Sequence, residues 1–210
     1  MKIAVSLIVF VFGYSLYSQD TIVKKDVNRY VIWFSPEKKA TQVNGLMLNF
    51  FPNNINGLEG VRGYPDVNGI ELNLNPLVVF ALYPLMVGVI VPEFYKPPEE
   101  DLSSINFEDF KIINGIQVNI VNIESTVTNG FELSLFGSFN SRTDGVSFAF
   151  FMSKHYEVNG ITFATLGNQD IVCNGIQIGL FNTCRNLKGI QIGLFNKNQK
   201  RSMPLINWSF

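Results

Sequence analysis

The 210-residue chain is short of charged residues, histidine and cysteine. Charged residues make up 16% of the sequence, which is below the share in ordinary soluble domains. With a formal net charge of -1, the chain has no excess of Lys and Arg for binding nucleic acid phosphates. Its one histidine, His155, leaves little material for a metal or catalytic cluster. These shortages predict a non-enzymatic protein without catalytic residues, cofactor or metal.

The N-terminal region lacks an apolar run long enough to span a bilayer. Met1-Lys2 precedes an apolar stretch at residues 3–12, and the segment that follows ends on the small residue Ser18. A membrane helix needs about 20 apolar residues, whereas a short basic start, a shorter apolar stretch and a small residue are typical of a secretory signal peptide. We predict that residues 1–18 are this signal peptide, and that the mature chain begins at about Gln19.

What the chain does have is an internal repeat. The segment 175–182, Gly-Ile-Gln-Ile-Gly-Leu-Phe-Asn, recurs unchanged at 189–196. Looser copies begin at Gly45, Gly57, Gly69, Gly115, Gly130, Gly145 and Gly160. From Gly115 to Gly189 the interval between successive glycines is nearly constant. We predict one β-repeat domain over 19–210, interrupted at 77–110 by an insertion of one or two buried strands and an acidic surface segment.

Within each copy the residues alternate with period two, which indicates β-strands. In one copy Ile176, Ile178 and Leu180 share a face, and Gln177, Gly179 and Phe181 share the other. Asn or Asp precedes most of the repeat glycines, and Asn-Gly favours positive φ and tight turns or bulges. We therefore expect Asn-Gly at the entry to each strand. Polar segments such as 140–143 and 183–186 are expected to be loops.

The expected fold is all-β, with about twelve short strands of ~15-residue period in an antiparallel meander that closes into a barrel. The alternative is a β-solenoid, in which identical residues at identical phase stack in ladders. A mostly polar second half of each repeat favours the meander, and so do the shorter early spacings from Gly45 to Gly57 and from Gly57 to Gly69. The last segment, 203–210, ends on Phe210 and places Pro204, Ile206, Trp208 and Phe210 on one face. That pattern is typical of the closing strand of a bacterial outer-membrane barrel.

The two cysteines distinguish these architectures. In a meander, Cys173 and Cys184 lie at opposite ends of one strand, roughly 30 Å apart, which is too far for a disulfide. In a solenoid, the chain from Cys173 to Cys184 nearly completes one coil and brings the two residues together. The meander therefore predicts two free cysteines.

Three groups of residues are candidates for a site. We expect His155 to be a solvated loop histidine rather than a catalytic base. Acidic residues that offer oxygen ligands to Ca²⁺ lack a recognisable loop spacing, so a solvated acidic loop is expected; they are Glu99, Glu100, Asp101, Glu108 and Asp109. The phenylalanines, which offer a carbohydrate-stacking or lipid-facing surface, are expected to pack within the sheet.

The repeats and the closing Pro-Leu-Ile-Asn-Trp-Ser-Phe resemble the bacterial surface-repeat family of exported proteins found in spirochaetes and the Bacteroidota. The resemblance covers residues 43–210 and is most specific over 174–210. It implies export and association with the cell surface or outer membrane, and it supplies neither an activity nor functional residues.

We therefore expect a non-enzymatic exported surface or outer-membrane β-repeat protein with a structural or interaction role. The outer membrane is a candidate partner, and nucleic acid is not. The alternative is a secreted β-solenoid that binds a glycan or a protein through its exposed face.

Overall fold

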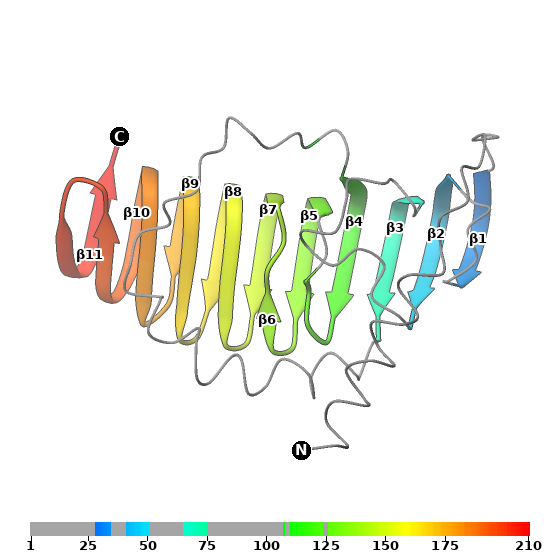
Figure 1. Ribbon diagram of the computed structural model, residues 1–210, viewed down its shortest axis with the longest axis horizontal. Helices are drawn as coiled ribbons and strands as arrows, with labels where there is room; N and C mark the ends of the chain where they lie inside the picture. The colour runs from blue at the N-terminus through cyan, green and yellow to red at the C-terminus, as the bar shows by residue number, and fades with distance from the viewer. Residues whose placement is uncertain (1–27, 35–40, 51–64, 75–106, 108–109, 124–125) are drawn as a thin grey trace, which may run out of the picture.

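The computed structural model describes residues 28–34, 41–50, 65–74, 107, 110–123 and 126–210, and the regular structure in this part of the chain is β (Figure 1). The strands are β1 (Asn28–Phe34), β2 (Gln42–Asn49), β3 (Asp66–Asn73), β4 (Lys111–Asn119), β5 (Thr126–Ser134), β6 (Gly137–Ser138), β7 (Arg142–Ala149), β8 (Met152–Ala164), β9 (Gly167–Ile178), β10 (Phe181–Asn198) and β11 (Ser202–Ser209). In one long sheet they follow the order β1-β2-β3-β4-β5-β7-β8-β9-β10-β11, and β6 pairs with β8 beside it.

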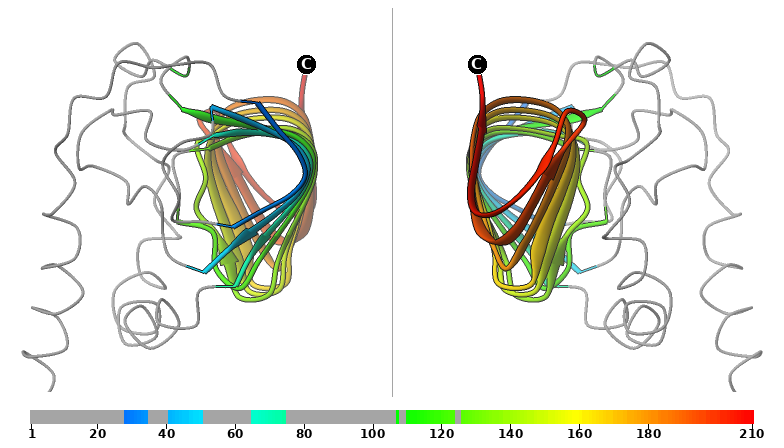
Figure 2. Two further views of the ribbon diagram at one scale, coloured as in Figure 1. Left: turned by 90° about the vertical axis from the view of Figure 1, so that its right-hand side faces the viewer. Right: turned by 90° about the vertical axis from the view of Figure 1, so that its left-hand side faces the viewer.

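The strands from β1 to β10 pair in parallel, so the fold is a β-solenoid and not a barrel (Figure 2). Repeat glycines lie opposite one another in neighbouring strands, as Gly160 does with Gly145 and Gly175. The expected antiparallel meander is therefore wrong. Period-two alternation is the same in parallel and antiparallel strands, so it does not distinguish the two folds. Identical residues stand at the same position in successive copies, and this feature, which supports the solenoid, agrees with the structure.

Each coil returns along a second side instead of reversing its direction. In the later coils this side is also a parallel sheet, in which Gly137 pairs with Met152, Met152 with Gly167, and Gly167 with Phe181. Strands β8, β9 and β10 therefore bend from the second side onto the main sheet. The segments 140–143 and 183–186 were expected to be loops, yet β7 begins at Arg142 and β10 contains all of 183–186.

The first coils also differ from the expected spacing. β1, which covers most of the degenerate copy at 30–36, pairs in parallel with β2 and is confirmed as a strand of the same sheet. β2 pairs directly with β3, with Gly45 opposite Gly69. The two short intervals, from Gly45 to Gly57 and from Gly57 to Gly69, therefore together span a single coil. The copy at Gly57 lies outside the described residues. β3 pairs directly with β4 across the 77–110 insertion, and the strands expected within that insertion also lie outside the described residues.

The repeat glycines are required by the backbone and lie inside the strands, not at their entry. Their φ angles run from 139° at Gly130 to 153° at Gly175, a region closed to most other residues. Neighbouring coils also approach closely here. A Cβ added at Gly175 would lie 1.8 Å from the carbonyl oxygen of Gly160. The Asn-Gly pairs thus mark a bend within each strand, with the positive φ that the sequence predicts.

The asparagines that precede the glycines form a ladder along the outside of the coils. Each side-chain Nδ2 donates to the Oδ1 of the preceding coil at 2.6–2.8 Å, from Asn68 to Asn44, Asn114 to Asn68, Asn129 to Asn114, Asn159 to Asp144 and Asn174 to Asn159. The ladder is interrupted between Asn129 and Asp144, because a carboxylate has no N–H to donate. Asp144 instead accepts from Arg142 at 2.9 Å.

The interior of the solenoid is largely polar. Two residues after each glycine the side chain is buried, and along the array this position is Met47, Glu71, Gln117, Glu132, Ser147, Thr162, Gln177 and Gln191. On the second side, Ser153, Asn168, Asn182 and Asn196 form another buried row joined by hydrogen bonds of 2.6–2.8 Å. The polar second half of the repeat favours a meander only while each copy is considered alone. It is compatible with a solenoid because stacked amides and hydroxyls bond to the same groups one coil away.

β11 ends the array by turning back against β10 in the antiparallel direction. Asn207 is fully buried and donates to Gln191 at 2.8 Å, so it continues the interior row. Ile206 and Trp208 point outward and continue the exposed face of the sheet. The alternating pattern at the C-terminus is therefore confirmed as a strand, but the strand covers the end of a solenoid and does not close a barrel.

Candidate functional site

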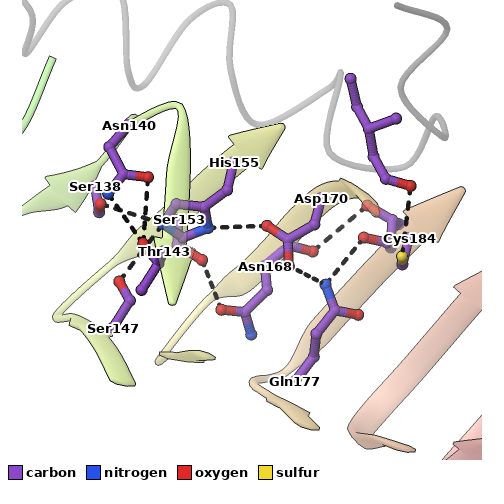
Figure 3. A network of polar contacts seen from close by, with 12 residues as sticks. Ser138, Asn140, Thr143, Ser147, Ser153, His155, Asn168, Asp170, Gln177 and Cys184 are labelled. Carbon is purple, nitrogen blue, oxygen red and sulfur yellow. Dashed lines mark hydrogen bonds and ion pairs between the residues drawn. The ribbon is translucent and has the colours of Figure 1, made fainter. Parts of the chain in front are cut away.

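A cluster of ionisable groups lies inside the solenoid around His155 (Figure 3). We call Glu132, Ser138, Ser147, His155 and Asp170 the buried acid–histidine cluster; each is at most 1% exposed. One member comes from each of the successive strands β5, β6, β7, β8 and β9. His155 was expected in a solvated loop, and this is wrong because it lies within β8 and faces inward.

The histidine ring bridges two carboxylates. Its Nδ1 lies 2.9 Å from Oδ1 of Asp170, and its Nε2 lies 3.9 Å from Oε2 of Glu132. The hydroxyl oxygens of Ser138 and Ser147 lie 3.3 and 3.5 Å from Nε2. The imidazole is therefore surrounded by groups that stabilise its charged form.

Each carboxylate has its own hydrogen-bond donors. Ser138 and Asn122 donate to Oε1 of Glu132 at 2.5 and 2.8 Å. Asn140 and Ser147 donate to Oε2 at 3.0 Å. Gln177 donates to Oδ2 of Asp170 at 2.6 Å. The two acids are thus buried with partners, which is the condition for keeping a charge inside a protein.

These contacts place a serine, a histidine and an aspartate in sequence, as in a hydrolase triad, but the hydrogen bonds differ from those of a catalytic triad. In such a triad the serine hydroxyl gives its proton to the histidine, which requires a neutral imidazole nitrogen as the acceptor. Here Ser138 donates to Glu132 instead, at 2.5 Å. All members of the cluster are enclosed by the coil, and a substrate has no access to a fully buried hydroxyl. The geometry is that of a charged group that ties coils together.

The pKa of His155 is raised above its ordinary value of 6.5. Burial lowers it, but the hydrogen bond and the charge of Asp170 and the charge of Glu132 together outweigh burial. A raised folded-state pKa means that the folded protein binds this proton more tightly than the unfolded chain does. The stabilisation is therefore complete below the unfolded-state pKa and disappears as pH rises through the folded-state pKa.

We accordingly expect the free energy of unfolding to fall as pH rises above about 6.5, by at most about 1.4 kcal/mol per pH unit for one proton. Urea denaturation at a series of pH values measures this slope. A His155→Gln variant, whatever its absolute stability, should lack the slope. Equal slopes in the two proteins would contradict the assignment of the proton to His155.

A second ion pair is buried among the earlier coils. The Nζ of Lys111 contacts Oε1 of Glu71, and Gln117 donates to Oε2 of the same carboxylate at 3.3 Å. Lys111 is 7% exposed and Glu71 is fully buried. This pair joins β3 to β4 across the 77–110 insertion, so it fixes the register of two strands that are far apart in sequence.

The two cysteines meet inside the later coils. Cys173, Cys184 and Leu187 form a buried hydrophobic cluster, and both thiols are free. A hydrogen bond with Cys184 and burial raise the pKa of the Cys173 thiol, which disfavours the reactive thiolate. The prediction of free cysteines agrees with the structure, but the separation of roughly 30 Å on which it was based is wrong. The coil brings the thiols together, as the solenoid alternative requires.

Within the part of the chain that the structure describes, no group of three or more His, Cys, Asp and Glu side chains is placed to hold a metal ion. The acidic residues Glu99, Glu100, Asp101, Glu108 and Asp109 lie outside that part. Across the same described ranges, the structure contains no helix with the length and apolar character needed to cross a membrane.

The outer face of the main sheet carries a continuous surface of one chemical kind. We define the apolar face as the two rows of side chains that lie one and three residues after each glycine, together with those aligned with them in β1 and β11. The first row is Ile32, Leu46, Ile70, Ile116, Phe131, Val146, Ile161, Ile176, Ile190 and Trp208, and the second is Leu48, Leu72, Val118, Leu133, Phe148, Phe163, Ile178, Ile192 and Ile206.

Both rows are aliphatic or aromatic at every position, and their side chains are half-buried or exposed. Ile116 is 42% exposed at one part of the face and Ile192 is 42% exposed at another. The rings of Phe148 and Phe163 stack at 4.7 Å between neighbouring coils, as expected of phenylalanines that pack within the sheet, whereas Phe131 is 40% exposed. On soluble proteins, the largest contiguous apolar patches of several hundred Å² are often functional, so this face is a candidate interaction surface.

Sequence reasoning did not single out Glu132 and Asp170, although a signal was present. Asp170 follows His155 by one full repeat, and each stands five positions before its glycine. Asn140 and Cys184 occupy the same phase in the neighbouring repeats. In a solenoid, residues at the same position of successive repeats stack directly on one another. Once parallel coils are assumed, the shared position of His155 and Asp170 therefore predicts that they are in contact.

The fold and this surface define a β-solenoid with a polar interior and an apolar outer sheet. Comparisons of the chain with models of known protein families, with curated proteins and with solved structures find no match. The resemblance to the bacterial surface-repeat family remains a prediction from the repeat motif.

Proposed function

We propose that this chain is an exported, non-enzymatic β-solenoid that binds a protein partner through its apolar face. The observation that carries the proposal is the unbroken pair of apolar rows, which continue from Ile32 on β1 to Trp208 on β11. Burial of apolar surface is the main favourable contribution to most protein association. The buried acid–histidine cluster is enclosed instead, which supports a binding role over a catalytic one.

A protein suits this surface better than a glycan does. Glycan binding needs hydrogen-bonding groups beside the stacking rings, and the two rows contain aliphatic and aromatic side chains throughout. The nearest polar row consists largely of asparagines whose amides bond to one another, as Asn174 does to Asn159. A protein surface with a matching apolar patch needs no such groups.

Site-specific photo-crosslinking in the producing cells tests this proposal. A photoreactive residue placed at Ile116 or Ile161 should give a discrete covalent adduct with a protein. The matched control is the exposed, polar position Asn186 of β10, which should give little. Adducts of equal yield at all three positions, or none at Ile116 and Ile161, would overturn the proposed binding face.

The export part of the proposal has its own measurement. Fractionation of the same cells should place the full chain outside the cytoplasm, and N-terminal sequencing of the mature protein should begin at Gln19. Recovery of the intact chain with Met1 in the cytoplasm would overturn export without affecting the binding face.

A further inference from the structure

We infer that the protein partner of the apolar face is a second copy of this chain, so that two solenoids pack face to face as a homodimer. This inference rests on the proposed function and names its partner. The area of the surface, its spacing, its lack of charge and the blocked end of the array carry it.

The area of the apolar face is above the minimum for a biological interface. The main sheet has nine intervals between successive strands from β1 to β11, which at about 4.8 Å each give a length of about 43 Å. The two rows and their margins occupy about four residues of strand, or about 13 Å. The projected area is then roughly 560 Å² per copy and roughly 1,100 Å² for a pair, just above the ~1,000 Å² that a biological interface needs.

The spacing of the rows favours a copy of the same surface. Side chains along each row repeat at the distance between paired strands, and only another stack of β-strands has that repeat. Two such sheets pack at about 10 Å with their side chains interdigitated. In a two-fold dimer the same patch is used by both copies, so each row lies against rows of the same period along its full length.

The absence of charge on the face disfavours partners that are recognised electrostatically. The members of both rows are uncharged, and in the adjacent outer row the residues before the glycines include one acid, Asp144, and one base, Lys188. Anionic lipid surfaces attract proteins through clusters of Lys and Arg, and the apolar face has none. Homodimer interfaces, by contrast, are more apolar than other interfaces.

The described C-terminal edge of the array, β11, is protected against pairing with a further strand, which disfavours association through this edge. The Nη2 of Arg201 donates to the carbonyl oxygen of Trp208 at 2.6 Å, and its Nε donates to Oδ1 of Asn207 at 2.9 Å. The guanidinium carbon lies 4.6 Å from the centre of the Trp208 ring. Pro204, within β11, has no backbone N–H to pair with a further strand. Charge and proline on an edge strand are established devices against edge pairing.

Sedimentation velocity of the purified mature chain over a wide concentration range tests the inference. The wild-type chain should sediment as a dimer. Ile161→Glu places a charge in the middle of the face at a side chain that is 38% exposed, and should raise the dimer Kd by about 100-fold or more. Asn186→Glu adds the same charge outside the face and should leave the Kd unchanged.

Circular dichroism spectra and melting curves show whether each variant is folded, and Ile161→Ser provides a milder change if the glutamate variant is not. A wild-type chain that stays monomeric, or a dimer unaffected by both changes at Ile161, would overturn the inference. A monomer that floats with neutral phosphatidylcholine vesicles would overturn it in favour of a lipid partner. If the chain is monomeric but Ile116 and Ile161 crosslink to a different protein in cells, the inference fails and the proposed function stands.

Discussion

Replacing Gly175 with alanine should lower the free energy of unfolding by about 3–5 kcal/mol, the sum of the strain at a disallowed φ and of overpacking against backbone. The φ angle of Gly175 is 153°, and the added Cβ would lie 1.8 Å from the carbonyl oxygen of Gly160. Neither conflict is relieved by rotating a side chain, because both partners are backbone atoms. The strands on either side must separate, so the loss is larger than for an ordinary surface change. Urea denaturation followed by circular dichroism measures it.

Lys188→Ala is the control for this change. Lys188 is exposed and immediately precedes the repeat glycine of β10, so its loss should alter the free energy of unfolding by less than about 0.5 kcal/mol. A Gly175→Ala protein as stable as Lys188→Ala would show that neighbouring coils do not approach as closely as the parallel pairing of β8 and β9 requires.

Replacing Asp170 with alanine should cost about 3–5 kcal/mol, because it removes one partner from a buried ion pair and leaves the imidazolium of His155 without its closest counter-ion. The change also removes the acceptor for Gln177, which bonds to Oδ2 of Asp170 at 2.6 Å. Equilibrium denaturation at pH 6 measures the loss, since the histidine is charged in the folded protein there. The expected effect is that of an unpaired buried charge and not of a lost surface contact.

Asp144→Ala provides the matched control. Asp144 is also paired with a cation, Arg142 at 2.9 Å, but both side chains are about a third exposed, so its removal should cost less than about 1 kcal/mol. The double variant Asp170→Ala/His155→Ala should recover part of the loss, because the imidazolium is then absent and the remaining carboxylate, Glu132, keeps its hydrogen-bond donors. A single Asp170→Ala change no more costly than Asp144→Ala would contradict the account of the cluster as a charged tie.

The repeat itself was predictable because its spacing is nearly constant and its alternation is regular. The copies from Gly115 to Gly189 all appear as strands of one sheet, and even the degenerate copy at 30–36 belongs to it. Positive φ at the glycines was also predictable, since Asn-Gly favours it. These are properties of short segments, which the local sequence determines.

The direction of the strands was not predictable by the same means. Alternation places Ile176 and Ile178 on one face whether the neighbouring strand is parallel or antiparallel, so it does not decide the fold. A single repeat contains no hydrogen-bond partners for the polar residues of the second side, His155 among them. Considered one repeat at a time, the sequence therefore predicts that these residues are exposed to solvent. Their partners are the same positions one coil away, which become visible only when whole repeats are superimposed in phase.

The outer asparagine ladder has a direction, which gives the solenoid an aligned set of side-chain dipoles. The donating amides point their N–H toward the N-terminal coil; they are Asn174 and Asn159 in one part of the ladder and Asn129, Asn114 and Asn68 in the other. Amides aligned in this way polarise one another and strengthen as the row lengthens. Asp144 divides the row in two and ends the second part on a carboxylate, the strongest acceptor available to it.

The interior row on the second side is aligned the opposite way. Asn168 donates to Asn182, and Asn182 donates to Asn196, toward the C-terminal coil. The two rows overlap in the coils of β8 and β9, where one lies on the outside of the main sheet and the other in the interior. Where the two rows overlap, their side-chain dipoles therefore oppose each other. The other interior row, in which Asn207 donates to Gln191 and Gln191 donates to Gln177, points the same way as the outer ladder.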